Sequence, residues 1–105
     1  WNNYIPKNYK IIIINNGGGG IFRILPGHSE NQTFNTFFET EHKLTAEHLA
    51  KMYHFNYLKA DNEADLNMAL KLLFTQNEQP QILEVFTPTK INRDLLRNYF
   101  TSISK

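Results

Sequence analysis

Two asparagines followed by four glycines form the segment of this sequence best suited to hold a ligand. The run Asn15–Gly20 comes directly after four isoleucines, which predict a buried β-strand over 10–15. Glycine lacks a Cβ atom, so its backbone can adopt positive φ and come close to a ligand. Asparagine amide oxygens and backbone carbonyls are hard oxygen donors of the kind that Mg²⁺ accepts. A diphosphate bound together with Mg²⁺ is therefore a chemistry that this run could serve.

The common phosphate-binding motifs do not fit this run. A G-x-G-x-x-G pattern begun at Gly17 or Gly18 would need its last glycine where Phe22 or Arg23 stands. A G-x-x-x-x-G-K-[ST] pattern begun at Gly17 would need glycine and lysine at those same two positions. One alternative stays open, namely a glycine-rich turn that only connects a strand to a helix. Four glycines are more than such a turn needs, which favours the approach of a ligand.

The other residues with chemical potential show no catalytic spacing. His42, His48 and His54 are each six residues apart, so they do not form the i, i+4 pair of a helical zinc site. We expect them to be surface or packing histidines. Glu39 and Glu41 could suggest a pair of carboxylates, but we expect both to be solvated acids of a loop.

Composition narrows the class of protein. The chain has 105 residues, which suits one small domain, and a net charge of only +1. That charge gives no basis for binding nucleic acid or a membrane surface, and no apolar segment approaches the roughly 20 residues of a membrane span. The absence of cysteine excludes disulfides and thiolate metal sites within this chain and favours a reducing, cytoplasmic location. Because the sequence begins at Trp1, we expect a piece of a longer protein.

The pattern of apolar residues predicts strands that alternate with helices. The expected strands are 10–15, 57–60 and 82–86. The expected helices are 45–53, 63–74 and the segment from Asn92 onward. A helical turn is expected over 20–25 and a polar loop over 28–36. Thr45, either Asp61 or Asn62, and Asn92 are the expected N-caps. This alternation predicts an α/β domain, with a parallel sheet flanked by helices.

Each predicted helix carries apolar residues on one face. The isoleucines over 10–15 show no polar alternation, which predicts a strand covered on both faces. Three strands make a small sheet, so we expect further strands before Trp1. Ligands of parallel sheets bind beyond the carboxyl ends of the strands, where Asn15–Gly20 lies. The helix faces are Leu49, Met52 and Tyr53; Leu66, Ala69, Leu70, Leu73 and Phe74; and Leu95, Leu96, Tyr99, Phe100 and Ile103.

The segment "IINNGGGGIFRILP" resembles a family motif, N-N-x-G-G-x-I-F-x-x-L-P. That family is the thiamine-diphosphate-dependent 2-succinyl-5-enolpyruvyl-6-hydroxy-3-cyclohexene-1-carboxylate (SEPHCHC) synthases. The asparagine pair resembles the second half of the thiamine diphosphate fingerprint, whose Gly-Asp half would lie before Trp1. "FFETEH", over 37–42, is similar to the F-F-x-T-P-H run of the family, with Glu41 in place of proline. Gly17 is a departure, because many members carry Asn or Asp there.

The resemblance implies a role for each residue of the motif. Residues 1–105 would be the C-terminal part of the thiamine diphosphate-binding domain. Asn16 would bind Mg²⁺ through its side-chain oxygen, and Gly18 through its backbone carbonyl. Gly19 and Gly20 would allow close passage of the diphosphate. The residues expected to contact the cofactor or face the substrate pocket are Ile21, Phe22 and Leu25, although packing within the helical turn is a nearly equal alternative for Phe22.

The resemblance also implies a reaction for the parent protein. Such a transferase decarboxylates 2-oxoglutarate and adds the succinyl-level carbanion to isochorismate, giving SEPHCHC in menaquinone biosynthesis. The parent would be a homodimer or homotetramer, and its activating glutamate would lie outside this chain, which alone would be inactive. Two alternatives stay open: another thiamine diphosphate enzyme, such as an acetolactate synthase or 2-oxo acid decarboxylase, and a non-catalytic α/β binding module. Composition and resemblance together predict an apolar patch in the separated chain, made of Ile21, Phe22, Leu25, Phe34, Phe37 and Phe38.

Overall fold

A computed structural model describes residues 4–25, 27 and 31–104 of the chain. The chain divides into two compact units. Unit 1 combines the chain up to Asn15 with Thr45–Phe86, and unit 2 combines Asn16–Leu44 with the chain from Thr87 onward. The boundary between the units therefore falls between the two asparagines of the motif.

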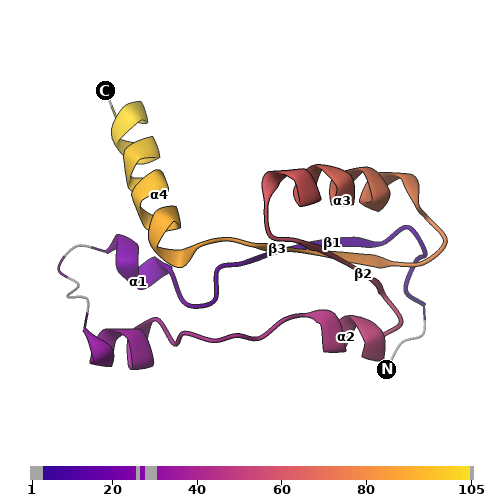
Figure 1. Cartoon of the computed structure of the whole chain (residues 1–105), viewed down its shortest axis with the longest axis horizontal. Coiled ribbons are helices and arrows are strands. Elements are labelled where there is room, and N and C mark those ends of the chain that lie inside the picture. Colours follow the sequence, from indigo (N-terminus) through magenta and orange to yellow (C-terminus); the bar gives the residue numbers. More distant parts are fainter. Residues whose placement is uncertain (1–3, 26, 28–30, 105) are drawn as a thin grey trace. The chain divides into compact units, whose positions relative to one another are not determined.

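Unit 1 contains a parallel sheet of three strands (Figure 1). The strands are β1 (Lys10–Asn15), β2 (Asn56–Ala60) and β3 (Gln81–Phe86), and their order is β1-β3-β2. Both pairings of the central strand β3 are parallel. Helices pack on both faces of this sheet, so the predicted α/β class is confirmed. Each strand also matches its predicted range to within one residue.

One face of the sheet is covered by α3 (Glu63–Thr75). Asn62 is its N-cap and accepts a hydrogen bond from the Asp65 amide at 2.9 Å, which decides between the two predicted caps. The predicted inward residue Phe74 is instead exposed. Ala69 and Leu73 of α3 pack with Ala60 and Leu83 of the sheet, as one buried cluster.

The prediction that β1 is covered on both faces is wrong for the described structure. Ile12 and Ile14 are paired with Leu83 and Val85 of β3, and so lie on the same face as the α3 cluster. They nevertheless remain 48% and 63% exposed. The reason is that α3 contacts β2 and β3, whereas β1 lies on the other side of β3 from β2.

The other face carries α2 (Glu47–Met52). Its N-cap is Ala46 and not the predicted Thr45, although the Thr45 hydroxyl does accept a 3.4 Å hydrogen bond from the Glu47 amide. Ala46 and Ala50 are buried against Ile82, because small side chains allow the helix backbone to approach the strand closely. The face expected to be apolar is exposed instead, and its residues are Leu49, Met52 and Tyr53.

Unit 2 contains α1 (Ile21–Ile24), a π-helix η1 (Phe34–Phe38) and α4 (Thr89–Ile103), and α1 contacts α4. The predicted helical turn over 20–25 corresponds to α1. The predicted loop over 28–36 is wrong at its end, because the Asn31 side chain accepts the Phe34 amide at 2.8 Å and Phe34 is buried. Residues 28–30 of that loop lie outside the described residues.

The last helix begins earlier than predicted. Pro88 is its N-cap, since proline suits the start of a helix, where a backbone N–H is not needed. Asn92 therefore lies inside α4, and its side chain donates to the Thr87 hydroxyl at 2.8 Å. The predicted apolar face of α4 is exposed, and its residues are Leu95, Leu96, Tyr99, Phe100 and Ile103.

Candidate functional site

The loop Asn16–Gly20 is an ordered turn with its own hydrogen bonds. The Asn16 side-chain oxygen accepts the Gly18 amide at 3.2 Å, and the Gly18 carbonyl accepts the Gly20 amide at 3.1 Å. The Thr89 hydroxyl donates to the Asn16 carbonyl. Gly17 has a φ of +72°, in the left-handed region that asparagine and aspartate also tolerate. This explains why the departure at Gly17 from the usual Asn or Asp is compatible with the same turn.

Gly18 is required by a contact with the chain itself. A Cβ atom on Gly18 would lie 2.9 Å from the backbone carbonyl oxygen of Glu39. One on Gly20 would lie 2.8 Å from the side-chain nitrogen of Asn16, which can move aside. The Gly19 amide donates to the Glu39 carbonyl at 2.6 Å, and the Gly17 carbonyl accepts the His42 amide at 2.8 Å. The glycines therefore have at least a partly structural role, as in the alternative of a turn that connects a strand to a helix.

Two oxygen atoms of the loop keep lone pairs that could bind a metal ion. The Asn16 side-chain oxygen and the Gly18 carbonyl oxygen each accept one of the hydrogen bonds given above. An sp² oxygen has two lone pairs, so each atom retains capacity for one metal ligand bond. Among the described residues, no group of three or more His, Asp and Glu side chains is placed to hold a metal ion. A magnesium ion on this loop would thus take its other ligands from phosphate, water or another part of the protein.

A buried ion pair lies beside the loop, and the sequence did not predict it. The two carboxylate oxygens of Glu39 accept hydrogen bonds from the Nε and Nη2 atoms of Arg23 in a bidentate pair. Arg23 also donates to the Asn35 side chain at 3.2 Å, and its guanidinium carbon lies 5.4 Å from the centre of the Phe34 ring. The prediction of a solvated Glu39 is wrong, because a bidentate guanidinium allows a carboxylate to be buried. Glu41 is exposed, as predicted.

A sequence signal for this pair existed. Arg23 interrupts the apolar run Ile21–Leu25, and a charge inside such a run must be either exposed or paired. The sequence alone does not say which carboxylate would pair with it.

The predicted pocket-wall residues are placed on the surface of unit 2. Ile21, Phe22 and Leu25 are 65%, 39% and 52% exposed. The Phe22 ring contacts the Phe38 ring edge-on with 5.8 Å between centroids, so packing accounts for part of its position. Of the predicted apolar patch, Phe34 is buried and the prediction is wrong there. The other members of the patch are exposed: Ile21, Phe22, Leu25, Phe37 and Phe38.

Unit 1 contains a second buried carboxylate, which the sequence pattern did not predict. Glu84, in the centre of β3, accepts hydrogen bonds from the Asn15 side chain at 2.7 Å, the Ala46 amide at 2.8 Å and the Tyr57 hydroxyl at 2.7 Å. It thereby joins the end of β1, the start of α2 and the strand β2. Burial, followed by the hydrogen bond to Glu84, raises the pKa of Tyr57. The signal was a single acid inside the apolar strand "ILEVF".

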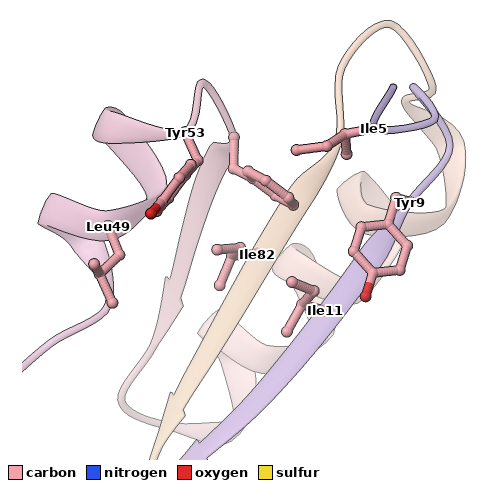
Figure 2. Close-up of a pocket in the computed structure, with 7 residues that line it drawn as sticks. Ile5, Tyr9, Ile11, Leu49, Tyr53 and Ile82 are labelled. Atoms are coloured by element: carbon pink, nitrogen blue, oxygen red, sulfur yellow. The ribbon is translucent and has the colours of Figure 1, made fainter. Parts of the chain in front are cut away.

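An open apolar hollow of about 570 Å³ lies on the α2 face of unit 1 (Figure 2). Ile11 and Ile82 are the second residues of their strands, so the hollow lies at the amino ends of the strands. The predicted ligand edge, at Asn15, is the opposite one. Among the described residues, no charged side chain lines the hollow, which gives it no evident chemistry. Its lining residues are Ile5, Tyr9, Ile11, Leu49, Tyr53, Phe55 and Ile82.

The described helices are all too short or too polar to span a lipid bilayer. The cytoplasmic location and the oligomeric state inferred from the sequence stay predictions.

Comparison with known proteins identifies close relatives of this segment. The chain is 64% identical over 104 residues to the SEPHCHC synthase of Flavobacterium johnsoniae, a match that covers 99% of this chain and 19% of the relative. The synthase of Flavobacterium psychrophilum is 62% identical over 104 residues, covering 99% of this chain and 19% of that protein. That of Christiangramia forsetii is 48% identical over 100 residues, covering 95% of this chain and 17% of that protein. No protein-family model matches the chain.

These matches extend the motif resemblance to the whole chain. The predicted similarity to the SEPHCHC synthases is confirmed over 99% of the sequence. The chain spans about a fifth of the length of the curated relatives it matches. Most of a protein of that kind therefore lies outside these 105 residues.

Proposed function

We propose that this chain, a relative of one segment of the SEPHCHC synthases, is the part of such an enzyme that holds the diphosphate of thiamine diphosphate and its Mg²⁺. The observation that carries the proposal is the 64% identity along 99% of the chain. The loop chemistry supports it, because two hard oxygen donors stand together on a turn directly after the end of β1. In this proposal, residues 1–105 are the C-terminal part of the cofactor-binding domain.

The residues of the loop would divide the binding between them. The Asn16 side-chain oxygen and the Gly18 carbonyl would each donate one lone pair to Mg²⁺, which prefers oxygen ligands and usually keeps phosphate and water in its shell. Gly19 and Gly20 would leave room for the diphosphate, since neither carries a side chain. The absence of a Cβ atom at both positions allows a phosphate to come close to the backbone.

The parent protein would use this anchor in a carbon–carbon bond-forming reaction. Bound thiamine diphosphate supplies the electron sink that decarboxylation of a 2-oxo acid requires. The proposed substrates are 2-oxoglutarate and isochorismate, and the product, SEPHCHC, would serve menaquinone biosynthesis. Ile21, Phe22 and Leu25 expose apolar side chains directly after the loop, and they would exclude water from the reacting groups.

The proposal is tested by replacing the proposed metal ligand in the full-length protein. Asn16→Ala removes one of few protein donors to Mg²⁺, so the affinity for thiamine diphosphate with Mg²⁺ should fall by roughly 10-fold or more, the equivalent of a contact worth at least about 1.4 kcal/mol. Activity should recover in part at high cofactor concentration. Isothermal titration calorimetry measures the affinity.

Asn77→Ala is the matched control, because Asn77 is an exposed asparagine in the segment between α3 and β3. It should bind the cofactor like the wild type. An unchanged affinity in Asn16→Ala would refute the assigned ligand, and a wild-type protein that does not bind thiamine diphosphate would refute the proposed function itself.

A further inference from the structure

We propose that Glu39 is a positioning residue for the loop Asn16–Gly20, which it holds from two sides at once. The inference rests on the proposed function, because it treats this loop as the site of Mg²⁺ and diphosphate. Glu39 itself would touch neither ligand. It would act through the backbone of Gly18 and Gly19 and through Arg23, which follows the loop on α1.

The first link is made by the main chain of Glu39. Its carbonyl oxygen accepts the Gly19 amide at 2.6 Å, and it lies 2.9 Å from the place where a Cβ of Gly18 would stand. The loop backbone therefore packs directly on this carbonyl, with no room for a side chain between them. Any shift of Glu39 must move the two glycines or break the hydrogen bond.

The second link is made by its side chain. Glu39 and Arg23 are both almost completely buried and form a bidentate pair, a geometry with little rotational freedom. The Arg23 amide in turn donates to the Gly20 carbonyl at 3.1 Å. One residue is thus connected to the middle of the loop by its backbone and to the end of the loop by its side chain.

The turn that presents Glu39 is also conformationally restricted. Thr40 has a φ of +50°, which is rare for a β-branched residue and is maintained only by surrounding contacts. Two residues further on, the His42 amide donates to the Gly17 carbonyl at 2.8 Å. Glu39 and His42 therefore contact the loop at Gly17, Gly18 and Gly19, and the ion pair fixes the side chain of Glu39 in turn.

This arrangement predicts a separation between ligand affinity and turnover. When the Glu39 carboxylate is neutralised, Arg23 keeps a buried charge without its counterion, and the pair must separate or take up water. The loop then loses its preorganised shape, so binding of Mg²⁺ and diphosphate becomes weaker. Once the cofactor is bound at saturation, the reacting groups are unchanged, and kcat should be retained.

The experiment compares Glu39→Gln with Glu41→Gln in the full-length protein, with thiamine diphosphate and Mg²⁺ as the probe. Glu39→Gln should weaken the affinity by roughly 10- to 100-fold, the effect typical of a residue that orients metal ligands. Its kcat at saturating cofactor should stay near the wild-type value. Glu41→Gln removes the same charge from an exposed side chain two residues away and should bind like the wild type. Equal affinity of Glu39→Gln and wild type overturns the proposal, as does a loss of kcat at unchanged affinity.

A second variant decides the case in which Glu39→Gln does not fold. Gly18→Ala leaves the ion pair intact but places a methyl group against the Glu39 carbonyl. It should weaken cofactor binding as well, and wild-type affinity in this variant overturns the proposal. The proposed function is refuted by a different result, namely that the wild type does not bind thiamine diphosphate with Mg²⁺. Only the role of Glu39 is refuted if the wild type binds, Asn16→Ala binds more weakly and Glu39→Gln binds like the wild type.

Discussion

Both units of this protein bury a glutamate, and they satisfy its charge in different ways. In unit 1, Glu84 accepts hydrogen bonds from an amide side chain, a backbone amide and a phenol, all of them neutral donors. In unit 2, Glu39 is paired with the guanidinium of Arg23. The neutral network joins β1, β2 and the start of α2 to the central strand β3. The ion pair joins α1 to the end of the π-helix η1.

The apolar surroundings of the two carboxylates differ as well. Unit 1 has a buried cluster on each face of its sheet, one with α3 and one with α2. Among the described residues of unit 2, Phe34 is the buried apolar residue, and it lies against Arg23. The shape of unit 1 is therefore supported by hydrophobic burial, and that of unit 2 depends much more on one ion pair.

The largest effect is expected from Arg23→Leu. This variant leaves the Glu39 carboxylate buried without a cation, and such a loss typically costs about 3–5 kcal/mol. Native-state hydrogen exchange of the full-length protein measures it, at the Gly19 amide that donates to the Glu39 carbonyl. The double variant Arg23→Leu/Glu39→Leu should recover part of the loss, because apolar replacement of both buried partners is often tolerated.

Lys51→Gln is the control for this prediction. It breaks the exposed Lys51–Glu47 pair on α2, in which water already screens both charges. Exchange protection at the sheet should be unchanged. If Arg23→Leu also left protection at Gly19 unchanged, unit 2 would not depend on its ion pair, and the contrast between the units would disappear.

A smaller effect is expected from Glu84→Gln in unit 1. The new amide nitrogen must face at least one of the three donors, so one buried donor loses its partner at a cost of about 1–3 kcal/mol. The surrounding apolar clusters should keep the sheet folded. Amide exchange at β3 measures the cost, and Glu78→Gln, which changes an exposed acid, should show none. A larger loss for Glu84→Gln than for Arg23→Leu would reverse the comparison.

The sequence predicted the elements of unit 1 far better than those of unit 2. Strands and α3 follow from local patterns, such as four successive isoleucines or the Asn62 cap with its spaced leucines. The π-helix Phe34–Phe38 buries Phe34, and the Arg23 guanidinium on α1 lies over the Phe34 ring. The polar residues before Phe34 predicted a loop, because a local pattern does not reveal a contact with another helix.

The same distinction applies to the candidate site. The run Asn15–Gly20 was chosen as a ligand site from its residue types, and its role in binding stays a prediction. Its supporting residue was missed because Glu39 looks like any acid in a polar stretch until Arg23 is placed beside it. The exposure of Ile12 and Ile14 was not predicted for a related reason. A run of apolar residues indicates a strand, but it does not indicate whether a helix covers each face of that strand.

The smallest effect, and the most sensitive to pH, is expected from Tyr57→Phe. The variant removes one of three hydrogen bonds to Glu84, a loss of about 1 kcal/mol at neutral pH. Burial and the hydrogen bond to Glu84 raise the pKa of Tyr57 above its ordinary value of 10.0, so the neutral phenol is favoured in the folded protein. The contribution of this group to stability is therefore fully present below pH 10 and is lost as the pH rises through the folded-state pKa.

Hydrogen exchange cannot be followed conveniently at such pH, so urea unfolding of wild type and variant from pH 7 to 11 is the appropriate measurement. The two free energies of unfolding should differ by a constant amount up to about pH 10 and converge above it. Tyr99→Phe, which removes an exposed hydroxyl of α4, should leave the unfolding free energy at neutral pH unchanged. A difference between wild type and Tyr57→Phe that grows with pH would show that the phenol does not stabilise the Glu84 network as a neutral donor.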